Sequence, residues 1–173
     1  MTPVPLAQTD VNTKRLISLF LVTMLVAIFV AELNVYDKVG RLRNGVALRY
    51  GPERPITPGA SANQGELPME NTPEVERLNT FTALLDITHA HIFELPLVVF
   101  VLAHFVMRAR VPDWLKLSLY VGSFGSIAAF LGAPWIVRYL WIAGGTGLLY
   151  LGSGGLAITC LAMIGIPLVD MWR

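Results

Sequence analysis

The sequence predicts an all-α integral membrane protein with four transmembrane helices. Of its 173 residues, 54% are hydrophobic and 14% are charged, whereas a soluble domain carries about 25% charged residues. The apolar residues gather in four runs, each close to the roughly 20 residues that a bilayer-spanning helix requires. The net charge of +1 gives no reason to expect a nucleic-acid partner, and the single cysteine, Cys160, leaves no intrachain disulfide to form.

The first transmembrane helix is predicted over residues 16–33. Lys14 and Arg15 precede its apolar run, and Glu32 closes it. Basic residues before an apolar core also mark a secretory signal, but this run is long for a signal and no small-residue cleavage site follows it. We therefore expect a helix that is retained in the membrane.

A long loop, residues 34–72, is predicted to connect the first two spans. Apolar residues recur at helical spacing from Val35 to Tyr50 with basic residues between them, a pattern typical of an amphipathic helix. Such a helix either lies in the membrane interface or packs against other subunits, and the pattern allows both. Residues 51–71 are rich in Pro, Gly, Ala and Asn and predict an irregular segment.

The second span is predicted over residues 73–107 as one helix with a kink at Pro96. Residues 71–73, Asn-Thr-Pro, form a helix start. If the helix began at Pro96 instead, only about 12 residues, or about 18 Å, would precede Arg108. That length cannot cross a hydrocarbon core of about 30 Å. Pro96 is therefore expected inside the helix, where it bends the axis.

The third span is predicted over residues 115–133, with Pro134 as its end, and the fourth over residues 141–169. A tight aromatic link joins them. The fourth span is rich in glycine, which suits either close approach of another helix or room for a flat haem ring. Four crossings place both termini on the same side of the membrane.

Basic residues predict the orientation of the four spans. Those that flank the spans gather on one side, which the positive-inside rule assigns to the cytoplasm. They are Lys14, Arg15, Arg108, Arg110, Lys116 and Arg173. Both termini are then cytoplasmic, the 34–72 loop lies on the outer side, and a bacterial inner membrane is the expected location.

The ionisable residues of the second span are the candidate functional site. His89, His91 and His104 are the only histidines of the protein, and Asp86 and Glu94 lie among them. Ionisable groups in hydrocarbon are costly and usually face a bundle interior, a partner or a water-filled cavity. At 100° per residue, Asp86, His89 and His104 share one side of the helix, and His91 pairs with Glu94 roughly opposite.

A transition-metal site is the first interpretation. Carboxylates and imidazoles one turn apart on bundle helices build di-metal centres, and imidazole suits Zn, Cu or Fe. Glu32 ends the first span at the depth of the outer pairs. The candidate ligands are Glu32, Asp86, His89, His91 and Glu94.

A haem b site is the second interpretation. His91 and His104 are separated by 13 residues, or about 20 Å of helix, which resembles the arrangement of paired ligands for two stacked haems in b-type cytochromes. His89 aligns better than His91 with His104 in direction. A second axial ligand is needed, and Met163 of the fourth span or histidines of a second subunit are candidates.

The third interpretation is a structural one, in which the polar side chains hydrogen-bond neighbouring helices. The protein is then a cofactor-free accessory subunit of a larger membrane complex. The leading prediction is a subunit of a respiratory or oxidative electron-transfer complex that holds a haem or a metal through the second span. The accessory subunit is the alternative, and both predict other membrane subunits and the lipid bilayer as partners.

Overall fold

The computed structural model describes residues 5–40, 44–52 and 80–173. Four of its helical segments are long and apolar enough to cross a membrane, so the predicted fold class is confirmed. In chain order the elements are the 3-10 turn η1 (Leu6–Gln8), α1 (Val11–Val35), the π-helical turn η2 (Tyr36–Gly40), α2 (Gly45–Tyr50), α3 (Phe81–Arg108), α4 (Asp113–Tyr139) and α5 (Ile142–Trp172).

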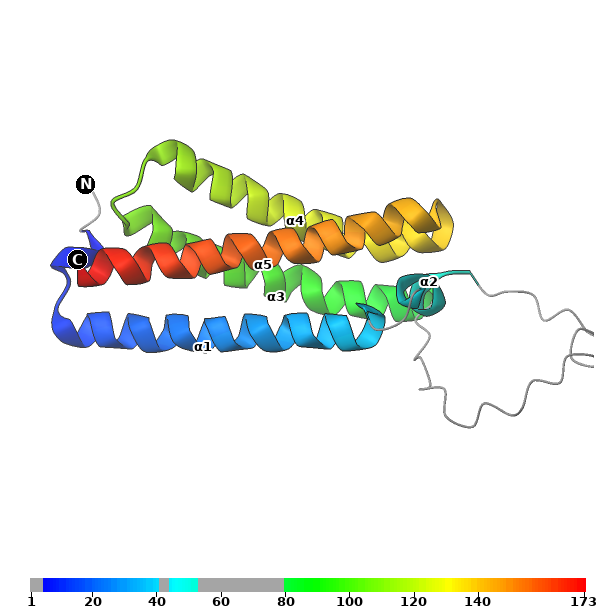
Figure 1. Ribbon diagram of the computed structural model, residues 1–173, viewed down its shortest axis with the longest axis horizontal. Helices are drawn as coiled ribbons and strands as arrows, with labels where there is room; N and C mark the ends of the chain where they lie inside the picture. The colour runs from blue at the N-terminus through cyan, green and yellow to red at the C-terminus, as the bar shows by residue number, and fades with distance from the viewer. Residues whose placement is uncertain (1–4, 41–43, 53–79) are drawn as a thin grey trace, which may run out of the picture.

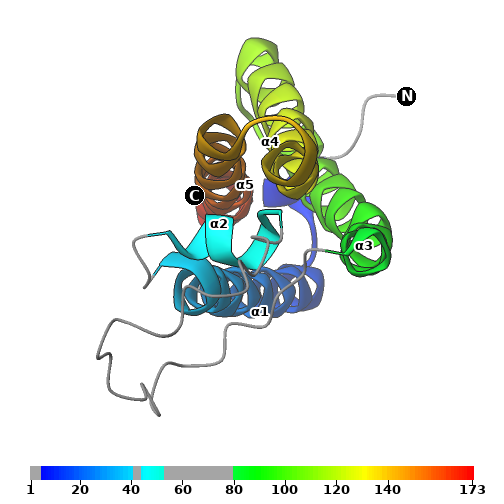
Figure 2. The same ribbon diagram turned by 90° about the vertical axis from the view of Figure 1, so that its right-hand side faces the viewer.

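The spanning helices form an elongated bundle in which α5 contacts α1, α3 and α4 (Figures 1 and 2). We call one end of this bundle the terminal end, because α1 begins there and α5 ends there. The opposite end contains α2 and the turn between α4 and α5, and we call it the hairpin end. The main core is built from side chains of η1 and all four spans, among them Leu21, Leu102, Ile127 and Met163.

The segment from Val35 to Tyr50 corrects the prediction of one amphipathic interfacial helix. Part of it continues α1 as η2, part forms the short α2, and residues 41–43 lie outside the described ranges. Val39 and Val46 are 3% and 2% exposed and pack in a second core cluster that contains Val137 and Leu149. The apolar side of this segment therefore covers the chain's own α4 and α5 rather than lipid.

The second span begins later than predicted. Thr80 is the N-cap of α3, has extended backbone angles, and accepts a hydrogen bond from the amide of Ala83 at 3.2 Å. The helix is therefore not continuous from residue 73, and residues 73–79 lie outside the part of the chain that is described. Pro96 lies inside α3, as predicted, because the helix continues to Arg108. The kink itself stays a prediction.

Pro134 does not end the third span, which corrects the boundary at residue 133. It lies inside α4, which continues to Tyr139. Proline is tolerated in spanning helices because neighbouring groups and local adjustments satisfy the carbonyl that it leaves without a donor. The turn closes where the amides of Leu140 and Trp141 both donate to the carbonyl of Ile136. Likewise α5 extends past residue 169 to Trp172.

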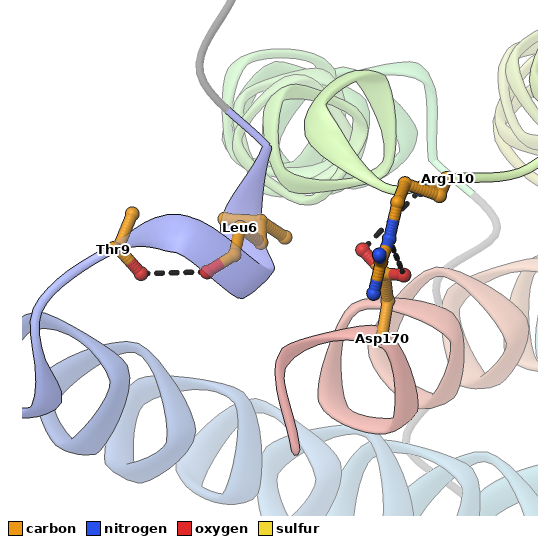
Figure 3. Close-up of polar contacts among 4 residues, drawn as sticks. All are labelled: Leu6, Thr9, Arg110 and Asp170. Atoms are coloured by element: carbon orange, nitrogen blue, oxygen red, sulfur yellow. Dashed lines mark hydrogen bonds and ion pairs between the residues drawn. The ribbon is translucent and has the colours of Figure 1, made fainter. Parts of the chain in front are cut away.

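Side-chain hydrogen bonds join the helices at the terminal end (Figure 3). The backbone amide and Nε of Arg110 donate to the carboxylate of Asp170 at 3.3 and 3.0 Å. Trp172 Nε1 donates to Ser18 Oγ at 3.1 Å. Directly after η1, Thr9 Oγ1 donates to the carbonyl of Leu6 at 2.7 Å. The end of α5 is thus joined both to α1 and to the turn after α3.

Candidate functional site

The three histidines lie on one continuous helix, α3, as predicted. They point in two directions, however. His91 is partly buried, and its ring centroid lies 6.5 Å from that of Phe130 on α4. His89 and His104 are exposed on the side that turns away from the bundle. Two separate sites therefore have to be considered, one inward and one outward.

The outward face of α3 combines ionisable and apolar side chains. We define this face by the exposed residues Asp86, His89, Phe93, Glu94, Leu97, Phe100 and His104. Within the described ranges, no hydrogen bond or ion pair joins any of its four ionisable side chains to another residue, although the ring of His89 meets that of Phe93 edge-on at 5.5 Å. In the end-on view α3 lies at the periphery of the bundle (Figure 2).

Glu94 is the residue of this face whose exposure to hydrocarbon would cost the most free energy. It lies near the middle of the 28-residue α3 and is exposed. A carboxyl group at this depth meets hydrocarbon unless another chain or water covers it. Within the described part of the chain, no hydrogen bond or ion pair satisfies the carboxyl group of Glu94.

The predicted five-residue metal cluster does not assemble within one chain. The carboxylate of Glu32 accepts hydrogen bonds from Ser153 Oγ at 2.9 and 3.1 Å. Asp86, His89 and Glu94 face outward, whereas His91 faces α4. Among the residues that the structure describes, no three His, Cys, Asp or Glu side chains are grouped so as to hold a metal ion.

Met163 and His104 do not form an axial haem pair within one chain. Met163 is 0% exposed in the core, where Ser123 Oγ donates to its sulfur at 3.9 Å. His104 is exposed on the opposite side of α3. Gly152 of α5 leaves no space for a haem ring either. A Cβ at this position would lie 2.5 Å from the backbone nitrogen of Phe130 on α4. Among the residues that the structure describes, Met163 is therefore not placed as an axial partner of His104.

The inward site is a cavity of about 200 Å³ at the hairpin end. Its polar lining residues are Asn34, Lys38, Arg49, Tyr50, Thr88 and His91, and its apolar ones come from α1, η2, α3, α4 and α5. Thr88 Oγ1 accepts a hydrogen bond from Trp135 Nε1 at 2.9 Å and donates to the carbonyl of Leu84. His91 Nδ1 is buried and has no hydrogen-bond partner within the described part of the chain.

Sequence reasoning missed the cavity because it placed the loop and the second span apart. The useful signal was the basic residues between Val35 and Tyr50. They lie between apolar residues that recur at helical spacing, and that pattern predicts an apolar side that faces lipid or another subunit. Once that side packs on α4, as Val46 does, Lys38 and Arg49 are brought to the same cavity as His91.

Four apolar spans and a polar face on one of them define the class of protein, an all-α integral membrane protein. The family model of a transmembrane helical domain, Aq_1264_TM, matches residues 70–173, more than half of the chain, and the protein belongs to that family. The match contains α3, α4 and α5, so both candidate sites include residues of the matched part. No curated protein and no solved structure matches the chain.

Proposed function

We propose that this protein is a subunit of a larger membrane assembly and that the outward face of α3 is its interface. The observation that carries this proposal is Glu94, an exposed carboxyl side chain near the middle of a spanning helix with no partner in the described part of the chain. Polar side chains within membranes usually face one another across helix interfaces. A polar interface satisfies Glu94, whereas lipid does not.

The occupant that fits this face is a second copy of the same chain. The face carries carboxylates and imidazoles together, so it presents both hydrogen-bond acceptors and donors to its own copy. A two-fold axis along the membrane normal brings identical residues to the same depth. His89 of one copy then lies close to Asp86 of the other, and Leu97 lies near the axis between Phe93 and Phe100.

Disulfide cross-linking in membranes tests this interface. In a Cys160→Ser background, Leu97→Cys is expected to give a covalent dimer after mild oxidation, because Leu97 is 63% exposed at the centre of the face. Leu151→Cys is the matched control, since Leu151 is 74% exposed on α5, away from α3. A Leu97→Cys variant that stays monomeric, or a control that cross-links equally well, would contradict the proposal.

An electron-transfer role is the second candidate function, and the direction of His104 favours it. His104 lies on the outward face of α3, so two copies related by the two-fold axis offer two imidazoles at one depth. Paired imidazoles suit a haem b or a transition metal. Such a group, when bound, would supply the one-electron chemistry that an electron-transfer role requires. His89 offers a second such pair closer to the hairpin end.

The visible spectrum of the purified protein separates the two functions. A bound haem gives sharp bands in the reduced-minus-oxidised difference, and His104→Ala is expected to remove them. His91→Ala, whose ring faces the cavity instead, is the matched control and is expected to keep them. A spectrum without such bands, together with no transition metal in elemental analysis, leaves the accessory subunit as the function.

The proposed location is a bacterial inner membrane with the terminal end in the cytoplasm. This orientation rests on the basic residues that flank the terminal ends of the spans, which the positive-inside rule places on the cytoplasmic side. Single cysteines introduced at the hairpin end are expected to react with a membrane-impermeant maleimide in intact cells, and those at the terminal end only after lysis. The reverse pattern would invert the topology.

A further inference from the structure

The cavity at the hairpin end has no role in the assembly proposed above. It lies on the inward side of α3, and none of its lining residues belongs to the outward face. Its wall combines an apolar part, which includes Leu84, Phe130 and Leu149, with basic and amide side chains. Mixed linings of this kind are typical of small-molecule sites, where a few polar groups fix the orientation of an otherwise apolar ligand.

We propose that this cavity binds the oxyanion headgroup of a membrane amphiphile, a carboxylate or a phosphate attached to an alkyl chain. Two cationic side chains, Lys38 and Arg49, line the cavity. Arg49 has a further interaction within the protein, so Lys38 is the cation that we expect to meet the headgroup. No acidic residue is among the described lining residues. Cation–oxyanion hydrogen bonds are stronger than neutral ones, particularly where water is partly excluded. The charge of the lining therefore selects an anion over a neutral or cationic headgroup.

His91 supplies a polar atom to the wall of the cavity. Its Nδ1 is buried without a hydrogen-bond partner in the described ranges. A neutral imidazole can carry its proton on Nδ1 and donate it, and a buried donor without an acceptor is unfavourable. An oxygen of the headgroup in the cavity would accept this hydrogen bond. The Thr88 hydroxyl lines the same cavity, but it is hydrogen-bonded to Leu84 and Trp135 and not to His91.

The size and position of the cavity fit a headgroup rather than a whole lipid. A volume of about 200 Å³ is below the roughly 300 Å³ of the smallest typical ligand pockets. The cavity therefore holds the oxyanion and the first carbons of the ligand, while the remainder of the ligand's alkyl chain stays in the bilayer. Asn34 and Lys38 are exposed and mark the mouth of the cavity, whereas Arg49, 6% exposed, lies deeper.

Three ligands with the same ten-carbon chain test the proposal. Binding of decanoate, decyl phosphate and decanol to the full-length protein in mild detergent can be followed by native mass spectrometry. We expect one saturable site for decanoate or decyl phosphate and none for decanol. The preferred anion identifies the source as a fatty acid or a phospholipid. Equal binding of decanol would overturn the proposal, because the cavity would then select only the alkyl chain.

Matched variants on α3 locate the binding site. His91→Ala is expected to weaken binding of the preferred anion by about tenfold, the effect of losing one hydrogen bond to a charged group. Ile92→Ala is the matched control, because Ile92 is the next residue, is 48% exposed and belongs neither to the cavity lining nor to the outward face, and it is expected to bind like the wild type. Lys38→Gln provides a second test that does not disturb the core, and it is expected to weaken binding by a similar factor. Wild-type affinity in both His91→Ala and Lys38→Gln would place the ligand elsewhere.

Discussion

Helix α5 is held in the bundle differently at its two ends. At the hairpin end its backbone is in close contact with that of α4, and at the terminal end α4 leans away from α5 (Figure 1). A Cβ at Gly145 would lie 2.6 Å from the backbone nitrogen of Val137, and one at Gly152 would lie 2.5 Å from that of Phe130. At the terminal end, α5 is held by Asp170 and Trp172 through hydrogen bonds to other elements.

This difference shows what can hold helices together in a bilayer. Lipid is as apolar as leucine, so burying apolar side chains between helices gives little net driving force there. Close backbone packing through small residues replaces that force at the hairpin end. Hydrogen bonds near the aqueous interface replace it at the terminal end, where no such close approach occurs. The predictions below test each end in turn.

The largest effect is expected from Gly152→Val, which breaks the close contact at the hairpin end. The added methyl groups meet the backbone of Phe130 on α4, which cannot move aside as a side chain can. Overpacking of this kind destabilises by about 3 kcal/mol. Thermal unfolding in detergent, followed by circular dichroism, measures the loss.

Gly154→Val is the matched control for this prediction. Gly154 lies on the same helix two residues later, and a Cβ there meets nothing within 4 Å. Both variants introduce the same side chain into α5 and carry the same helix-propensity change. If both lower the unfolding temperature equally, propensity rather than helix contact explains the loss, and the account of the hairpin end is wrong.

A smaller effect is expected from Asp170→Asn at the terminal end. Asp170 is 12% exposed on its side chain and accepts from both the backbone and Nε of Arg110, which is 57% exposed. Because the arginine is largely solvated, we expect a loss of only about 1 kcal/mol. Asp113→Asn is the control, since Asp113 is 98% exposed in its 3.5 Å contact with Lys116. If Asp113→Asn lowers the stability as much as Asp170→Asn, the Arg110–Asp170 pair does not have the proposed role in holding α5.

The sequence predicted the four spans well because each rests on one strong local signal. A run of apolar residues near bilayer length predicts a span regardless of what surrounds it. The argument from helix length likewise placed Pro96 inside α3, as found. Pro134, in contrast, is predicted as the end of the third span without such an argument, and this prediction is wrong because α4 continues to Tyr139. Whether a proline ends a spanning helix depends on tertiary packing, which the sequence does not show.

The site was predicted less completely because helical phase does not say which side faces inward. The sequence placed Asp86, His89 and His104 on one side of α3, and the structure shows that this side is the exposed one. Only the packing of α4 and η2 reveals that His91 faces a cavity. Nothing local in the sequence links Glu32 with Ser153, which are 121 residues apart yet hydrogen-bonded.

The smallest effect is expected at Asp10, which begins α1 at the terminal end. Its carboxylate accepts hydrogen bonds from the hydroxyl and the amide of Thr13. The bond from the Thr13 side chain is the main reason that the pKa of Asp10 lies below its ordinary value of 3.8. A lowered pKa in the folded state means that the cap stabilises the helix above the ordinary pKa and is lost as the pH falls through the lowered one.

Amide hydrogen exchange at Thr13 measures this cap directly. As the pH falls below 3.8, we expect the protection of the Thr13 amide to decrease once the intrinsic pH dependence of exchange is removed. Asp10→Asn is the matched control, because asparagine caps helices about as well as aspartate and does not titrate in this range. It is expected to keep the protection and lose its pH dependence. Since Asp10 is fully exposed, the change should remain within the first turn of α1, and a shift in global unfolding would show that the terminal end depends on this cap more than its contacts explain.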